Sequence, residues 1–129
     1  MRRAVRIRTA ATALVGAAAF ALLLPSTPAA ASTAYGCDWP KVCFYLTGGD
    51  WSRRDPTAEY QDVTRHFQEL GPRSKGSDWI FNSRNDDRAL IRYTFGGSTG
   101  EVCLGPNKSL SLGAHTTVTH LKIEDARAC

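Results

Sequence analysis

The chain of 129 residues contains four cysteines, and all four lie after residue 36. An even number of cysteines in a small exported domain is typical of a disulfide framework, in which covalent links supplement a modest core. Four cysteines allow three pairings. We favour Cys37–Cys43, which closes a short loop before an apolar run, and Cys103–Cys129, which holds the C-terminal residue where chains otherwise fray.

A metal site is the alternative use of these cysteines, and their spacing argues against it. Five residues separate Cys37 from Cys43, and the sequence has no Cys-x-x-Cys pair. His115 and His120 are five positions apart, which suits neither one face of a helix nor one face of a strand. We therefore expect no structural zinc.

The first 31 residues have the three-part pattern of a secretory signal peptide. Four arginines precede an uncharged run from Thr9 to Leu24, Pro25 ends this run, and the residues 29–31 are small alanines. The apolar run is shorter than the about 20 residues that a membrane-spanning helix needs. We predict a signal peptide over residues 1–31, a secreted extracellular product, and no membrane association after cleavage.

Residues 32–129 have a length that suits one disulfide-bonded β domain, which we expect to be a monomer. The whole chain has 16 basic and 12 acidic residues. The signal segment contains four of the basic residues, which leaves 12 basic residues to balance the 12 acidic ones. Binding to nucleic acid or to an anionic membrane needs excess positive charge, so neither partner is expected.

Short β-branched and aromatic runs alternate with Gly, Pro, Asn and Asp after residue 36, which is typical of a sandwich or barrel. In the run Val42–Leu46, alternation places Val42, Phe44 and Leu46 on one face. The clearest hairpin joins Leu90–Phe95 to Glu101–Leu104 through a glycine-rich turn. Further strands are expected at Trp79–Phe81, around Leu110 and Leu112, and at Val118–Ile123.

One segment has a helical pattern instead. Asp55 and Pro56 are typical of an N-cap with proline at the first helical position. Four apolar residues follow at helical spacing before Gly71 and Pro72: Tyr60, Val63, Phe67 and Leu70. The pattern predicts a helix over Pro56–Leu70. The Val63-Thr64 pair and the aromatic residues also suit a strand.

No arrangement of catalytic residues is recognisable in the sequence. Neither His-Glu-x-x-His nor Gly-x-Ser-x-Gly occurs, and oxidised cysteines are not nucleophiles. Nothing local organises the three histidines, His66, His115 and His120, into a triad. The glycine-rich stretch 96–100 precedes a strand and lacks Gly-Lys-Ser/Thr, so it predicts a turn and no phosphate site. We expect a protein that is not an enzyme and has no cofactor.

Two clusters have both a functional and a structural interpretation. Asn85, Asp86 and Asp87 offer oxygens that suit calcium, but such residues are equally good turn formers, and Arg88 follows directly to neutralise them. We place the turn ahead of calcium. The sequence has three tryptophans: Trp39, Trp51 and Trp79. They suit a carbohydrate-binding face, but tryptophans more often fill the core of a small β domain.

Five runs share a pattern of cysteines, aromatic residues and an Asn/Asp turn: Cys37 to Tyr45, Tyr60 to Thr64, Asn82 to Ala89, Tyr93 to Phe95, and Val102 to Asn107. This pattern resembles peptidase inhibitor family I36, a group of small secreted actinomycete proteins typified by a Streptomyces metalloproteinase inhibitor. The resemblance spans nearly all of residues 32–129.

The resemblance implies a βγ-crystallin-like fold, in which two Greek-key motifs pack as a sandwich. It also implies a strand within Glu59–Phe67, which we prefer to the helix for most of that segment. The expected fold is therefore all-β, with room for one short helix. The family also implies a calcium motif that Asp86 and Asp87 match. Because Leu90 and Ile91 stand at its two hydroxyl positions, we expect weak or no calcium binding.

The resemblance further implies inhibition of an extracellular protease by a stiff loop with a scissile bond after a cysteine. Such a loop binds like a substrate and loses little entropy. The nearest match is Cys103–Leu104, and the apolar Leu104 suits a thermolysin-like metalloprotease. No second cysteine follows shortly after Cys103, so the local clamp is missing, and we prefer a buried structural role for it.

A second function class uses the same scaffold without inhibition. One fold hosts many functions, so the resemblance also fits a non-enzymatic extracellular module that binds a partner, acts like a toxin or is structural. Protease inhibition is the first hypothesis, and this module is the alternative.

Overall fold

The computed structural model describes residues 33–129, so the expected signal peptide at residues 1–31 lies outside the described residues. The described chain consists mainly of β-strands, which confirms the all-β class. No helix in this range is long and apolar enough to cross a membrane. The elements are β1 (Thr33–Ala34), β2 (Cys37–Asp38), β3 (Val42–Tyr45), α1 (Gly48–Arg53), β4 (Ala58–Tyr60), β5 (Gln68–Glu69), β6 (Trp79–Asn82), β7 (Arg88–Phe95), β8 (Ser98–Leu104), β9 (Ser109–Ser111) and β10 (Thr116–Glu124).

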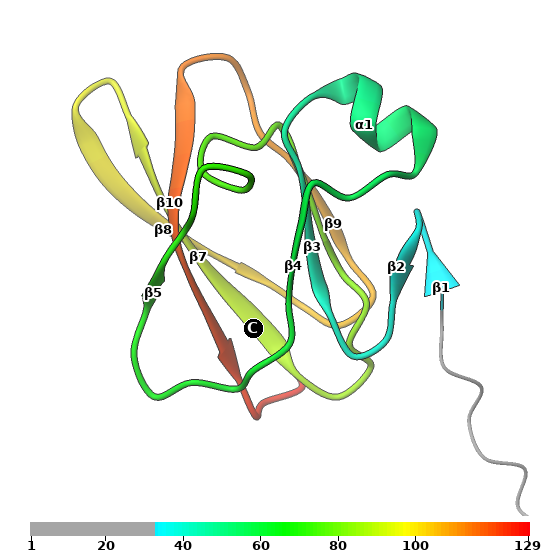
Figure 1. Cartoon of the computed structure of the whole chain (residues 1–129). Coiled ribbons are helices and arrows are strands. Elements are labelled where there is room, and N and C mark those ends of the chain that lie inside the picture. Colours follow the sequence, from blue (N-terminus) through cyan, green and yellow to red (C-terminus); the bar gives the residue numbers. More distant parts are fainter. Residues whose placement is uncertain (1–32) are drawn as a thin grey trace, which may run out of the picture.

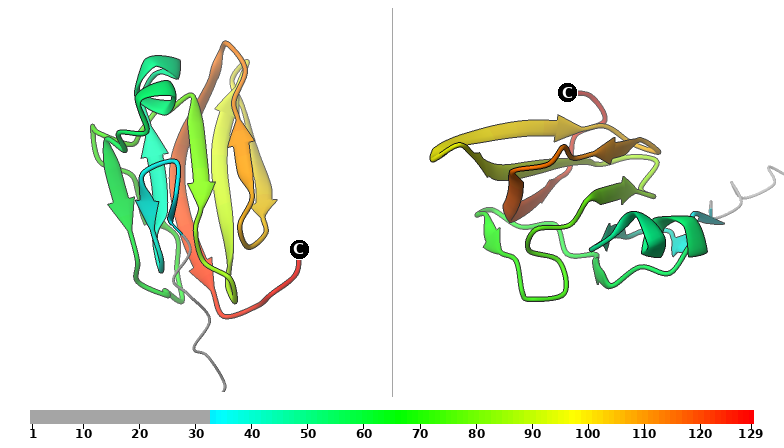
Figure 2. Two further views of the ribbon diagram at one scale, coloured as in Figure 1. Left: turned by 90° about the vertical axis from the view of Figure 1, so that its right-hand side faces the viewer. Right: turned by 90° about the horizontal axis from the view of Figure 1, so that it is seen from above.

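Two four-stranded antiparallel sheets face each other, and the small sheet of β1 and β2 lies beside them (Figure 1 and Figure 2). Their strand orders are β4-β3-β6-β9 and β5-β10-β7-β8. The strands β3 to β6 and β7 to β10 thus form two halves with one arrangement. In each half the fourth strand pairs with the first, and the third strand, β5 or β9, joins the opposite sheet. Each sheet is therefore completed by a strand from the other half.

The main core lies between the two sheets, because alternate residues of a strand point to the same face. Val42 and Phe44 of β3 are fully buried there, as the alternation in this run predicts. Ala89 and Ile91 of β7 face them from the other sheet. The buried residues of β10 are Val118, Leu121 and Ile123. Their spacing is uneven because the pairing with β7 shifts its register after Val118.

A second, smaller core lies on the other face of β3. Cys43 and Tyr45 are fully buried in it, and Trp51 and Trp79 pack against them. Trp51 stacks on Trp79 with ring centroids 4.5 Å apart, and on Tyr35 with centroids 4.2 Å apart. Burial raises the pKa of the Tyr45 phenol, whose hydroxyl donates a hydrogen bond to the carbonyl oxygen of Tyr35. The aromatic stack therefore fastens the N-terminal hairpin to the sheet.

The one helix in residues 33–129 is α1, which follows β3. Thr47 caps it, since its hydroxyl accepts a hydrogen bond from the Asp50 amide while the Asp50 carboxylate accepts one from the Thr47 amide. The Thr47 hydroxyl also donates to this carboxylate and holds the pKa of Asp50 below its usual range. Arg54, with φ of 58°, ends the helix in the left-handed conformation.

The helix predicted over Pro56–Leu70 is wrong. The segment contains β4 and β5, and its apolar residues serve different sheets. Tyr60 ends β4 and packs edge-on against Phe44, whereas the Leu70 amide donates to the carbonyl of Thr119 in β10. Tertiary pairing therefore overrides the helical spacing. The preferred strand within Glu59–Phe67 is found at its start, where β4 covers Glu59 and Tyr60.

The predicted hairpin is confirmed as β7 and β8, and its turn is tighter than expected. Phe95 pairs with Ser98, so only Gly96 and Gly97 form the turn. Their φ values of +55° and +83° are ones that glycine adopts at little cost. This hairpin is the long antiparallel ribbon that extends beyond the sandwich in Figure 1.

Candidate functional site

Both favoured disulfides are confirmed. Cys37 bonds to Cys43 and Cys103 bonds to Cys129, and no described cysteine is free. The first joins the N-terminal hairpin to β3, and the second fastens the C-terminal residue to β8. Two disulfides are typical of proteins in an oxidising environment.

The pair Cys103–Leu104 is not a loop. Both residues belong to β8, where Leu104 pairs with Ala89 of β7. Leu104 is only 5% exposed and belongs to the main core, and its carbonyl accepts a hydrogen bond from the Asn82 side chain. A protease needs a peptide bond that it can reach, so this buried bond within a sheet does not fit the expected inhibitory bond. Cys103 is disulfide-bonded to Cys129 and is partly buried, not fully buried as the preferred structural role has it.

The acidic cluster is a turn in which the Asp87 carboxylate is engaged by an arginine. Asp87 is 4% exposed and forms an ion pair with Arg84, which is itself 8% exposed. The neutralising arginine is thus Arg84, not the expected Arg88, which pairs with Glu124 of β10. Asp86 has one buried carboxylate oxygen without a hydrogen-bond partner. No group of three His, Cys, Asp or Glu side chains in residues 33–129 is placed to hold a metal.

The tryptophans do not form one exposed face. Trp51 and Trp79 stack within the second core, as the structural interpretation predicts, while Trp39 is 41% exposed in the turn after β2. The histidines are also separated. His66 lies between β4 and β5, His115 lies in the turn before β10, and His120 lies in β10 with its Nδ1 atom 2.9 Å from the Thr119 hydroxyl.

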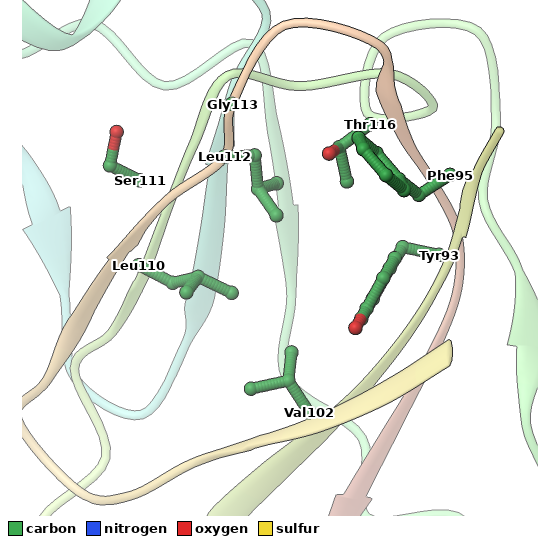
Figure 3. Close-up of a pocket in the computed structure, with 8 residues that line it drawn as sticks. All are labelled: Tyr93, Phe95, Val102, Leu110, Ser111, Leu112, Gly113 and Thr116. Carbon is green, nitrogen blue, oxygen red and sulfur yellow. The ribbon is translucent and has the colours of Figure 1, made fainter. Parts of the chain in front are cut away.

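An apolar groove opens between β8 and β9, the neighbouring edge strands of the two sheets. Its volume is about 340 Å³ (Figure 3). Tyr93 and Phe95 of β7 face Leu110 and Leu112 across it, and Phe95 is 56% exposed. Gly100 lies directly beside the Tyr93 ring, where a Cβ atom would be only 2.5 Å from the ring carbon that bears the hydroxyl. The groove has no charged lining residue.

A second candidate surface is the segment of residues 61–67, which crosses from β4 in one sheet to β5 in the other (Figure 1). We call it the crossing segment. Val63 is 50% exposed. Five of the seven side chains of the segment are exposed: Gln61, Asp62, Val63, Arg65 and His66. No ion pair joins Arg65 to a carboxylate in the described part of the chain.

Backbone and side-chain contacts hold the crossing segment at several points. The guanidinium of Arg84 donates to the Gln61 carbonyl at 2.9 Å. The Thr64 amide donates to the Ile123 carbonyl at 3.1 Å, and Val63 forms a parallel bridge with the same residue. At its end, the Arg92 guanidinium lies 3.6 Å from the centre of the Phe67 ring. The segment is thus exposed in its side chains and fixed in its backbone.

Sequence reasoning missed this segment because its contacts are distant in the chain. The helical spacing predicts that Val63 and Phe67 share one buried face, whereas Val63 is exposed and Phe67 lies under Arg92. The polar residues around Val63 and Phe67 are the one sequence signal that indicates an exposed segment instead of a helix packed on the core.

Comparisons with protein families, curated proteins and solved structures find no significant match for this chain.

Proposed function

We propose that this chain is a secreted protein that inhibits extracellular proteases. The observation that carries the proposal is the crossing segment, in which exposed side chains stand on a backbone fixed by Arg84 and Ile123. A protease must reach the backbone and side chains of the segment that it binds. A segment already held in place loses little entropy on binding, and this favours tight association over rapid turnover.

Three further features support an extracellular inhibitor. The N-terminal pattern indicates export, and the two disulfides suit an oxidising environment. The strand β5, which follows the segment, pairs with β10, and the two disulfides add covalent links elsewhere in the domain. In each half, the pairing of the fourth strand with the first follows Greek-key order, which supports the resemblance to the inhibitor family and its βγ-crystallin-like fold.

The position of Leu104 weakens the expected link to metalloproteases. That target class was inferred from an apolar Leu104 in an exposed loop, and this side chain is in the main core. The protein should therefore be titrated against one protease of each main class: thermolysin, subtilisin, trypsin and papain. Stoichiometric inhibition of any one of them supports the proposal. No inhibition by protein that is recovered intact contradicts it.

The apolar groove favours a second candidate, a module that binds a small uncharged molecule. Ligand sites commonly have volumes of about 300–1,000 Å³ and apolar linings, and this groove has both properties. Phe95→Ser would remove an exposed lining side chain without touching the crossing segment. Binding of an uncharged apolar dye that is lost in this variant, with no protease inhibited, would favour the second candidate.

A further inference from the structure

The crossing segment places one basic side chain at the position where the chain bends. Val63 and Thr64 both contact Ile123 of β10, and the chain then bends at Arg65 and His66. Arg65 and His66 are both exposed, whereas the flanking Thr64 and Phe67 are partly buried. Arg65 is therefore an exposed basic group at the bend, between residues whose contacts hold the chain on both sides.

One hydrogen bond spans the peptide bond after Arg65. The hydroxyl of Thr64 donates to the carbonyl oxygen of His66 at 2.8 Å. This contact joins the residue before Arg65 to the residue after it. Because Thr64 is itself held by Ile123 of β10, the contact ties both sides of the Arg65–His66 bond to the sheet.

We propose that Arg65–His66 is the reactive bond of the inhibitor and that Arg65 occupies the specificity pocket of a protease that cleaves after basic residues. This inference rests on the proposed function and names its target class. Such a pocket contains a carboxylate, and a guanidinium with no carboxylate partner among residues 33–129 is available to form a bidentate ion pair with it.

The same contacts explain why the complex would persist. Hydrolysis of Arg65–His66 consumes one water, breaks the C–N bond, and leaves a carboxyl group on Arg65 and an amino group on His66. The Thr64–His66 hydrogen bond and the Ile123 contact hold the two new ends near each other, while Phe67 is retained beneath Arg92. The cut ends therefore do not diffuse apart, which favours religation and slow release.

The test compares trypsin inhibition by the wild-type chain and three variants. Arg65→Ala should raise the inhibition constant at least 100-fold, and Arg65→Lys should restore most of the inhibition. Arg73→Ala is the matched control, because Arg73 is also exposed but lies outside the crossing segment. Its inhibition constant should equal that of the wild type. Thermal unfolding of each variant would confirm that the scaffold is unchanged.

A second measurement examines the bond itself. Prolonged incubation with trypsin should produce a single slow cut, and N-terminal sequencing should find a new chain that begins at His66. Thr64→Val removes the hydroxyl contact, so its cut should be at least 10-fold faster and its inhibition temporary.

Different outcomes would overturn the inference and the proposed function. Inhibition of thermolysin, subtilisin or papain without inhibition of trypsin, or equal inhibition by Arg65→Ala, overturns the inference and leaves the proposed function in place. Rapid cleavage after Arg65 without inhibition also overturns the inference, because the segment is then an ordinary substrate. No inhibition of any protease by intact protein overturns both.

Discussion

Arg84 and Asp87 form a buried ion pair within the turn that links β6 to β7. The Arg84 Nε atom donates to the Asp87 carboxylate at 2.6 Å. The same guanidinium donates to the carbonyl oxygens of Pro40 and Gln61. One arginine therefore joins the turn before β3, the crossing segment and the acidic turn, and Asp87 supplies the charge that makes its burial tolerable.

Asp87→Ala should lower the free energy of unfolding by about 3–5 kcal/mol, because it leaves the Arg84 charge buried without its partner. Urea denaturation would measure the change. Asp125→Ala is the matched control, since Asp125 is exposed, and it should stay within about 0.5 kcal/mol of the wild type. A loss below about 1 kcal/mol for Asp87→Ala would mean that the ion pair contributes little.

Calcium should leave the melting temperature nearly unchanged. The Asp87 carboxylate is engaged by Arg84, and the two hydroxyl positions of the calcium motif are occupied by Leu90 and the fully buried Ile91. Any ligand that binds the native state alone would raise the melting temperature with its concentration. Thermal scans in excess calcium and in a chelator should therefore coincide within about 1 °C. A rise that depends on calcium and disappears in Asp86→Asn would contradict the prediction.

Sequence reasoning located the strands and disulfides where local pattern matches the final contacts. Val42 and Phe44 alternate into the core, and two glycines set the turn between β7 and β8. It was wrong over Pro56–Leu70, because Tyr60 and Leu70 pack beside different sheets, and no local spacing encodes the exchange of β5.

The candidate sites depend still more on distant contacts. Leu104 has the chemistry of a specificity residue, but its pairing with Ala89 directs it into the core. Arg65 has an ordinary sequence context. The backbone before Arg65 is held by Ile123 and Arg84, which lie 58 and 19 positions away from it in the chain. Only the tertiary structure brings these residues together.

Acid should weaken the native state partly through Glu124. Its hydrogen bond with Lys122, followed by that with Arg88, holds the pKa of the Glu124 carboxyl below its usual range. A carboxyl with a lowered native pKa stabilises the fold above its ordinary pKa of about 4.3, and this contribution is lost as the pH falls through the native value. Glu124→Gln should therefore be less stable than the wild type near neutral pH, and the difference should shrink in acid.

Unfolding in urea at several values between about pH 7 and about pH 3 would test the Glu124 prediction. Glu69→Gln is a suitable control, because Glu69 is exposed and its contact with Lys75 is a long 3.9 Å. Its stability should follow the wild type at each pH. A constant difference between Glu124→Gln and the wild type across this range would assign the effect to packing instead of charge.

Gly36→Ala should destabilise the protein by about 2 kcal/mol or more, because two constraints act on the same residue. Gly36 has φ of +74°, and a Cβ atom there would lie 1.9 Å from the carbonyl oxygen of Arg54. The backbone must then move, which would separate Tyr35 from Trp51 in the aromatic stack.

Gly113→Ala is the matched glycine control for Gly36→Ala. Its φ is not in the positive range, and no atom lies within 4 Å of the added Cβ, so its free energy of unfolding should be unchanged or slightly higher. Near-ultraviolet circular dichroism should show a weaker aromatic signal for Gly36→Ala alone. Equal stability of the two variants would mean that the backbone at Gly36 and at the end of α1 can move apart without loss of stability. The N-terminal hairpin of β1 and β2 would then be held by the Cys37–Cys43 disulfide.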